Sequence, residues 1–518
     1  MATNDLFGKG PVEGSEPVVS SEAESMDVVD MNAGSQHLRR TLRGKEVQLF
    51  AIGGAIGTGV FINMANGLTK GGPGSLLIGF LIWASFMWAV NECFAEMVCY
   101  MPVPAPFVRF GGEWVDEALG FAMGWNFYLN MAFLVPFEIV AMSVLIRFWS
   151  DAVPVWAVIV VMIVLYALLN TISVRYFGIS EFYFSIFKVF LIFGCFAYTF
   201  VTMSQSLVKC LGVNLIEGAF AEEHLVKGNS GRLCGLVSCL IQATFAICGP
   251  EYISSVAAET ENPRKILPKA FLFSGAISGK GTGAASPYVI SMERLQISGL
   301  ASLVNAMIMT SVFSSGNGLL FSATRTLHGM ALKGEAPRFL AKCTKAGVPI
   351  YALCATLFWC LLSFLQLGNS SATVLIWLAD LVTACQLLNY GATAVVYSYF
   401  YASIQAKGID RNALPYTFQP YTSYFAMAGT TVILLLQGYD LFVAEGWSIE
   451  YFFLDYTMIG FFILCFVFWK VVKRTKYVRP GTADIYLGGT KKEIDLYESL
   501  YTPRVETKLG AWFNRFFD

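Results

Sequence analysis

Long apolar runs constrain this chain more than any other feature of its sequence. Of its 518 residues, 56% are hydrophobic and 14% are charged, whereas soluble domains carry roughly 25% charged residues. A run of about 18 or more apolar residues with few charges is typical of a membrane-spanning helix. Such segments are helical because lipid offers backbone groups no hydrogen-bond partner. The sequence therefore predicts an all-α, multi-pass protein embedded in the lipid bilayer.

The apolar runs can be counted as candidate spans, and the count is odd. Eleven runs lie near residues 47–66, 76–101, 121–149, 153–174, 182–203, 233–257, 300–330, 348–366, 373–402, 422–444 and 450–473. Lys and Arg flank both the first and the last run, and the positive-inside rule places such flanks in the cytoplasm. Two ends on the same side require an even number of spans. One span is therefore missing from the count.

The basic loops indicate where the missing span belongs. The stretches 264–269 and 325–345 both carry the Lys and Arg residues of a cytoplasmic loop, yet only one strong span separates them. The apolar piece between Phe271 and Ala285 is Gly-rich and shorter than the roughly 20 residues that a crossing needs. We infer that a seventh span between Lys269 and Leu300 is absent from this chain.

The remaining regions are expected to be tails. Residues 1–37 are acidic, contain Ser and Gly and carry no signal peptide, which indicates a disordered cytoplasmic tail. Residues 38–473 form the transmembrane domain, and residues 474–518 a soluble cytoplasmic tail. The twelve cysteines and three histidines show no metal-ligand spacing. We expect no metal, no cofactor and no enzymatic nucleophile, and the net charge of −1 gives no indication of a nucleic-acid partner.

Glycines crowd the first apolar run. Gly53, Gly54, Gly57 and Gly59 fall within seven positions, and each lowers helix stability by about 1 kcal/mol. A broken helix is tolerated at membrane depth where its freed backbone lines a cavity, and free N–H groups at the start of a half-helix bind carboxylates. The alternative is close helix packing, because Gly53 and Gly57 form a GxxxG pair.

The sixth run is interrupted in the same manner. Gly249 and Pro250 break its helix because proline has no N–H to donate, and the buried Glu251 follows at once. Interruptions in the first and sixth spans are the pattern of two five-helix halves related as an inverted repeat, with a binding site at the midplane. The alternative for Glu251 is a position near a helix end, where it would reach the interface.

Two further ionisable residues lie inside apolar runs. Lys188 sits several residues into the fifth run, where desolvation would let it gain and lose a proton or replace a bound sodium ion. Its alternative is snorkelling to the interface. Glu138 follows Pro136 in the third run. It could relay protons or pair with a cation inside the bundle.

Several longer motifs carry a specific resemblance. They are Ile52-GGAIGTGVF-Ile62, Val115-DEALGFAMGWN-Phe127, Ser180-EFYFSIFK-Val189, Gly249-PEYISSVAAETENPRKILPKA-Phe271 and Val304-NAMIMTSVFSSGNGLLFSATRTLHGMAL-Lys333. From about residue 38 to 489 the chain resembles fungal amino-acid permeases, the yeast amino-acid transporter family of the amino acid–polyamine–organocation superfamily. It looks most similar to the general permeases of filamentous fungi. The resemblance implies a five-plus-five inverted-repeat fold and proton-driven amino-acid uptake at the plasma membrane.

The resemblance also implies roles for residues. Those matching the broken first helix, which receives the substrate carboxylate, are Gly57, Thr58 and Gly59. Those matching the unwound sixth helix, whose carbonyls meet the substrate amino group, are Phe245, Ala246 and Cys248, with Glu251 as its acidic residue. Lys188 matches the fifth-helix lysine proposed in the superfamily to couple transport to protons.

The chain departs from the family in two places. Roughly forty residues that include the seventh span are missing after Lys269, and Pro104-Ala105-Pro106 replaces a Gly/Ser-containing stretch before the third helix. The missing span leaves two alternatives to a proton–amino-acid symporter. One is an amino-acid sensor that binds without transport, and the other is a non-functional truncated product.

Overall fold

The structure is a computed structural model. It describes residues 64–103, 105–172, 174–210, 223–248, 299–344, 347–409, 418–443, 447–488 and a few single residues, among them Arg264, Lys491 and Asp495. Residues 48–63 of the first predicted span, residues 270–298, where the seventh span is expected, and Gly57, Thr58, Gly59 and Glu251 lie outside the described residues.

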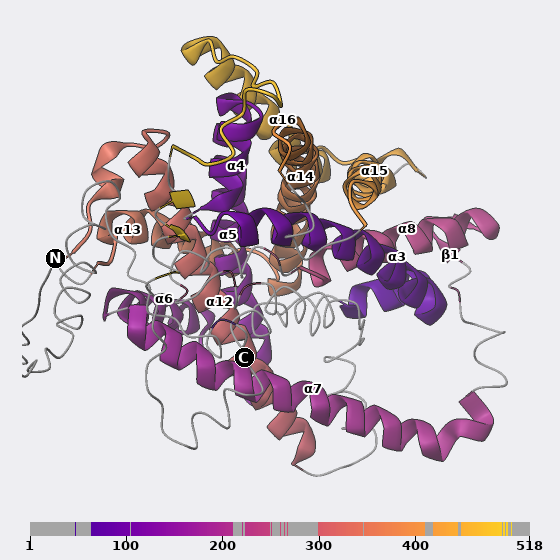
Figure 1. The fold of residues 1–518 in the computed structure, drawn as a ribbon. Coiled ribbons are helices and arrows are strands. Elements are labelled where there is room, and N and C mark those ends of the chain that lie inside the picture. The colour runs from indigo at the N-terminus through magenta and orange to yellow at the C-terminus, as the bar shows by residue number, and fades with distance from the viewer. Residues whose placement is uncertain are drawn as a thin grey trace, which may run out of the picture.

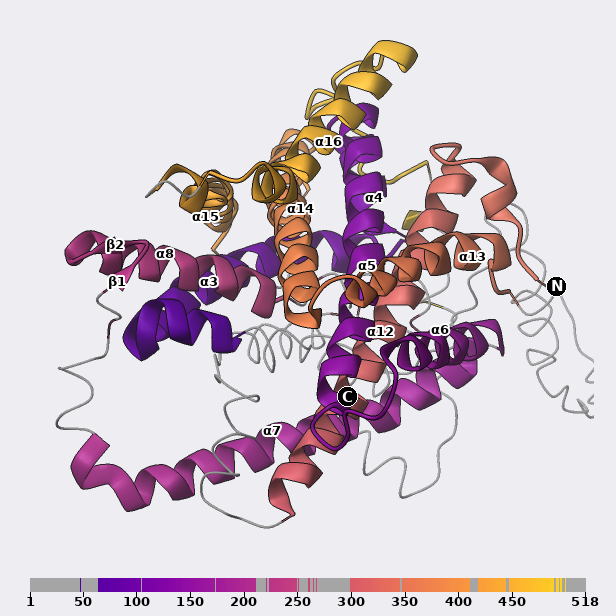
Figure 2. The same cartoon turned by 180° about the vertical axis from the view of Figure 1, so that it is seen from behind.

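The described chain is helical almost throughout (Figures 1 and 2). Its α-helices are α3 (Met64–Tyr100), α4 (Pro106–Trp114), α5 (Glu117–Ile146), α6 (Val155–Ile172), α7 (Val174–Cys210), α8 (Asn229–Ala246), α12 (Leu300–Lys333), α13 (Ile350–Trp359), α14 (Ser371–Ala406), α15 (Tyr421–Leu436) and α16 (Ile449–Lys473). Short 3-10 helices are η4 (Arg338–Ala341), η5 (Cys360–Leu367) and η7 (Tyr439–Phe442). The strands β1 (Glu223–His224) and β2 (Val226–Lys227) form one antiparallel pair before α8.

Seven helices in the described residues are long and apolar enough to cross a membrane, and α6 and α15 are shorter apolar helices. Ten of the eleven predicted runs fall on described helices. Two runs are interrupted. The helix of the sixth run ends at Ala246, shortly before the predicted break at Gly249-Pro250, since Ile247 adopts an extended conformation, and residues 251–257 lie outside the described residues. The run at 422–444 is helical only to Leu436, and Gln437 is extended there.

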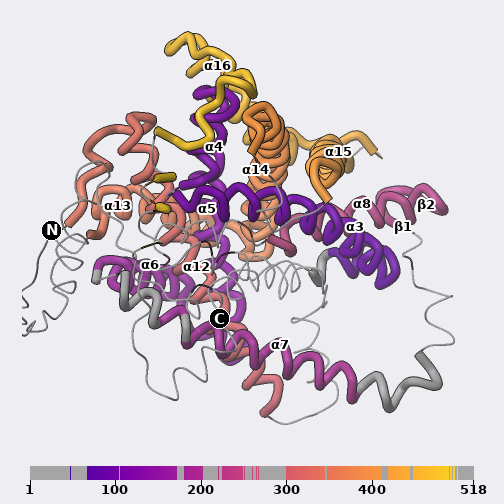
Figure 3. The backbone as a smooth tube through the Cα atoms, in the orientation of Figure 1, coloured from indigo at the N-terminus to yellow at the C-terminus, as the bar shows by residue number. Residues whose placement is uncertain are grey.

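Helix α5 is the central helix of the fold. Its side chains are buried on nearly every face, while α4, α12, α14 and α16 pack around it (Figure 1). Helices α7 and α16, in contrast, expose many of their Phe, Val and Leu side chains, as lipid-facing helices do. Helices α3 and α8 lie side by side on one flank of the molecule (Figure 3).

The chain enters α5 through a short helix that the sequence did not predict. The substituted stretch before the third span turns at Ala105, whose φ of 47° lies in the left-handed region. Helix α4 follows, and Asp116 then caps α5 by accepting a hydrogen bond from the Ala118 N–H at 2.9 Å. A side-chain cap of this kind satisfies one of the free N–H groups at a helix start.

Candidate functional site

The buried lysine of α7 is the core of the site. Lys188 is 1% exposed and is among the largest fully buried side chains of the described chain. Its ammonium group interacts electrostatically with two carboxylates, those of Glu181 and Glu138. A buried cation without a partner would be strongly destabilising. Lys188 therefore does not snorkel to the interface but belongs to a charge cluster inside the helix bundle.

Glu181 is a member of this cluster that sequence reasoning missed. It precedes Lys188 by seven residues, or about two turns of α7, so the two side chains share one face of the helix. Ser185 lies between them on the same face and is equally buried, while Tyr183 and Phe187 point outward and are exposed. Helix α7 thus turns a polar stripe inward and an apolar stripe outward. The spacing Glu-x3-Ser-x2-Lys within an apolar run is the signal that could have revealed it.

Helix α12 supplies the hydrogen bonds to Glu181. The Ser314 hydroxyl donates to Glu181 Oε2 at 2.6 Å, and Asn317 Nδ2 donates to Glu181 Oε1 at 3.1 Å. Asn317 is itself held from α6, because Asn170 Nδ2 donates to Asn317 Oδ1 at 2.8 Å. Both oxygens of a fully buried carboxylate are therefore satisfied, as buried charged groups require.

Glu138 reaches the same place from α5. It is 3% exposed, and the Ser315 hydroxyl donates to its Oε1 at 2.8 Å. Consecutive serines of α12 thus serve two different carboxylates. The prediction that Glu138 partners a cation inside the bundle agrees with its interaction with Lys188.

A buried hydroxyl without a hydrogen-bond partner lies beside the two carboxylates. Tyr166 of α6 is fully buried, interacts electrostatically with Glu138 and Glu181, and makes no hydrogen bond through its hydroxyl. A Cβ on Gly316 would lie 2.1 Å from that hydroxyl oxygen, so only glycine fits in α12 at this point. Orphan groups of this kind are rare in native proteins.

The end of α8 contacts α5 one residue before Glu138. The Phe245 ring packs edge-to-face against the Phe137 ring, with centroids 4.9 Å apart, one residue before Glu138 in α5. Ala246 is buried, and Cys248 is partly buried beyond the last turn. Because the helix ends here, the Ile247 carbonyl has no helical partner, and Trp83 Nε1 donates to it at 3.1 Å. The structure thus places Phe245 against Phe137, the neighbour of Glu138 in α5, while no described contact tests the binding of a ligand by Phe245, Ala246 or Cys248.

The comparisons with known proteins agree with this architecture. The sequence model of the family described as "Amino acid permease" matches residues 46–278 and 271–479. A general amino acid permease of Saccharomyces cerevisiae is 37% identical, over 89% of this chain and 84% of that protein. A proline-specific permease of Emericella nidulans is 31% identical, over 88% and 89%. A lysine/arginine permease of Candida albicans is 28% identical, over 86% and 82%.

A solved structure supports the fold. The manganese transporter of Eremococcus coleocola superposes with a TM-score of 0.53 at 11% identity, covering 85% of this chain and 98% of that one. A mutant of the same transporter gives a TM-score of 0.51. At this identity the likeness concerns the fold alone, which is that of an inverted-repeat transporter.

The aligned lengths also bear on the missing span. The alignment with the Saccharomyces permease runs over 498 positions, but 89% of 518 residues is about 461, so about 37 aligned positions have no residue in this chain. The family match is split into two segments, and they meet at residues 271–278, inside the stretch where the sequence predicts the deletion.

With the family match covering most of the chain and relatives above 30% identity along nearly its whole length, this protein belongs to the amino acid permease family.

Proposed function

We propose that the chain is a secondary active transporter that takes up amino acids together with protons across the plasma membrane. The observation that carries the proposal is the cluster of Lys188, Glu181 and Glu138, buried where α5, α7 and α12 meet. Ionisable residues inside a membrane are costly and are typical of proton relays and substrate pathways.

The charges of the cluster suit proton coupling. Two carboxylates and one ammonium give a net charge of −1 when all three are ionised, and one bound proton makes the cluster neutral. These groups interact, so the proton belongs to the cluster as a whole and not to one residue. In a low-dielectric interior the charged cluster and the protonated, neutral cluster differ strongly in energy. A proton bound here therefore biases the packing of α7 against α5 and α12.

The amino acid is proposed to bind at the interrupted helices. Carbonyl groups freed at Phe245, Ala246 and Cys248 would accept hydrogen bonds from the substrate ammonium, with Glu251 nearby. The N–H groups around Gly57, Thr58 and Gly59 would donate to its carboxylate. The relatives are named for different substrates, namely amino acids in general, proline, and lysine and arginine, and the resemblance favours a broad range of neutral substrates.

The proposed topology has both termini in the cytoplasm. It rests on the basic residues that flank the first and last spans. An intact family member would carry twelve spans, and this chain would have eleven through loss of the seventh. Sequencing the transcript across residues 265–285 tests this. An additional exon there would restore the seventh span and bring the count to twelve.

The experiment is uptake of labelled amino acids in a permease-deficient yeast host. We expect uptake by the wild-type chain that falls when a protonophore collapses the proton gradient. Lys188→Met should lose at least about tenfold in uptake, which corresponds to about 1.4 kcal/mol, and Lys188→Arg should retain more. Lys476→Met, which removes an exposed lysine, is the matched control. A chain that reaches the plasma membrane and binds amino acids without taking them up would refute transport.

A further inference from the structure

Three aspartates from three different elements lie near one another, away from the cluster around Lys188. Asp380 belongs to α14, Asp440 to η7 and Asp455 to the second turn of α16. The charges of Asp440 and Asp455 both act on Asp380. Asp440 is exposed, Asp380 is partly buried and Asp455 is 8% exposed. These residues, here called the outer acidic cluster, therefore lead from the surface into the helix bundle.

The positive charge near the outer acidic cluster comes from Lys70, an exposed residue close to the start of α3. Its ammonium group interacts electrostatically with Asp380 and Asp455. His224 of β1 lies near Asp440, but burial and the Lys70 charge lower the pKa of His224, which favours the neutral imidazole. Within the described part of the chain, three carboxylates thus face one lysine.

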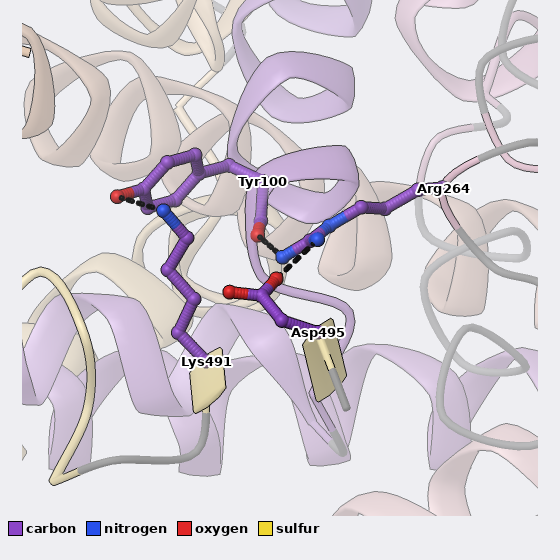
Figure 4. A network of polar contacts seen from close by, with 4 residues as sticks. All are labelled: Tyr100, Arg264, Lys491 and Asp495. Carbon is purple, nitrogen blue, oxygen red and sulfur yellow. Dashed lines mark hydrogen bonds and ion pairs between the residues drawn. The ribbon is translucent and has the colours of Figure 1, made fainter. Parts of the chain in front are cut away.

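Two acidic residues at the opposite end of the bundle have basic partners. Asp116, before α5, pairs with Lys470 near the end of α16. Asp495 pairs with Arg264, which donates to the carbonyl of Tyr100, the last residue of α3 (Figure 4). Charge is therefore balanced pair by pair at that end, whereas the outer acidic cluster carries an excess of negative charge.

The outer acidic cluster lies toward the extracellular side in the proposed topology. Asp455 precedes Lys473, the basic end of α16, by about five turns of helix, or about 27 Å. Lys70 and Tyr100 likewise lie near opposite ends of α3. Basic ends mark the cytoplasmic side. The excess negative charge therefore faces the side from which a substrate would be taken up.

A buried amide adds a hydrogen-bond acceptor to the cluster. Gln437 is 1% exposed, its Nε2 donates to the Asp380 backbone carbonyl at 3.2 Å, and its side chain also hydrogen-bonds Asp455. The Oε1 of this amide has no hydrogen-bond partner among the described residues. An amide oxygen and ionised carboxylates accept hydrogen bonds and cannot donate them. A cationic N–H group would satisfy the amide oxygen and offset the excess charge at the same time.

We propose that the outer acidic cluster and Gln437 form an entry-side site for organic cations, which binds an ammonium or guanidinium group before the substrate reaches the central site. In the described residues, no group of three His, Cys, Asp or Glu side chains could hold a metal ion, which favours an organic cation. Lys70 carries the same kind of charge and would compete with the ligand. This inference rests on the proposed transport function and topology.

The experiment compares uptake of labelled arginine with uptake of labelled citrulline, which has nearly the same shape without the guanidinium charge. Asp380→Asn and Asp455→Asn should raise the KM for arginine by about two- to fivefold and leave the KM for citrulline unchanged. Lys70→Met should lower the KM for arginine by about twofold. Asp151→Asn is the matched control, because Asp151 is an exposed acid in the turn that follows α5, and it should change neither KM.

The direction of each change separates charge from structural damage. A misfolded variant does not gain affinity, so a lower KM in Lys70→Met supports the site. Equal changes for arginine and citrulline in the two aspartate variants would overturn the proposal, because a proton-binding or structural role affects both substrates. An unchanged KM for arginine in those variants would overturn it as well.

A binding measurement distinguishes failure of this site from failure of the proposed function. Arginine should raise the Tm of the purified wild-type protein more than citrulline does, and Asp455→Asn should reduce that difference. Absence of uptake by a wild-type chain that shows this difference counts against transport and not against the site. Equal Tm shifts for the two amino acids would overturn the site.

Discussion

Removing the ammonium group of Lys188 should destabilise the protein by leaving two carboxylates buried without their cation. Glu181 and Glu138 are 4% and 3% exposed, so water cannot replace the lost partner. Removing one member of a buried ion pair typically costs about 3–5 kcal/mol. With an unfolding entropy of about 2.1 cal/mol/K per residue, a chain of this length converts that loss into a fall of about 3–5 °C in Tm.

The design of this test is a double-mutant cycle on the purified protein. Lys188→Met should lower Tm, Glu181→Gln should lower it less because the amide keeps a hydrogen-bonding side chain, and the double variant should be more stable than Lys188→Met alone. Coupling between residues in contact is typically 0.5–3 kcal/mol. The deficit of Lys188→Met should also shrink as pH falls, because protonation removes the unpaired negative charge.

The control for this cycle is Lys476→Met, which removes an exposed lysine outside the bundle. A Lys188→Met protein as stable as wild type would refute the argument that the ammonium balances the two carboxylates. Additive effects of the two substitutions would show that Glu181 and Lys188 do not interact.

Three further predictions concern stability. Ser315→Ala removes the hydrogen bond to the Glu138 carboxylate. We expect the free energy of unfolding to fall by about 1.5–3 kcal/mol in thermal unfolding, and uptake to fall as well. Ser315→Thr is the conservative comparison. Asp116→Ala removes both the α5 cap and the ion pair with Lys470. We expect the free energy of unfolding to fall by about 1–2 kcal/mol. The control Asp151→Ala, in an exposed turn, should change Tm little. Glu335 follows α12, and burial, opposed by the nearby Lys333 charge, raises its pKa to about 7. Since the folded protein holds this proton more tightly than the unfolded chain, stability should fall as pH rises from about 4.5 to 7. Glu335→Gln should reduce the difference in Tm between pH 5 and pH 8. An unchanged difference would contradict the raised pKa of Glu335.

The membrane class and most of the helices could be predicted because the signals that define them are local. An apolar run long enough to cross a bilayer must be a helix wherever it packs. The end of α8 near Gly249-Pro250 was predictable for the same reason, since proline disrupts the helix ladder whatever surrounds it. The left-handed turn at Ala105 and the short α4 helix were not predicted, because no periodic pattern marks them.

The cluster around Lys188 was predictable only in part. Lys188 and Glu138 stand out because a charge within an apolar run is rare. Glu181 lies at the start of its run and looks like an interfacial residue until α12 is seen to supply Ser314 and Asn317. Its role depends on which face of α7 meets α12, and helix packing decides that.

The C-terminal tail shows the same division. The charged composition after residue 473 indicates a soluble tail, and the four buried apolar residues Ala483, Ile485, Leu487 and Ile494 are too few to predict burial from sequence. Three of them, Ile485, Leu487 and Ile494, join the apolar core to which α3, α4, α5 and α14 also contribute. The sequence by itself determined that this protein lies in a membrane, where its helices run and which helix breaks, because the physics of each segment in lipid depends on that segment alone. Only the tertiary structure decided which charges meet and what the tail packs against, because those contacts join residues from distant parts of the chain.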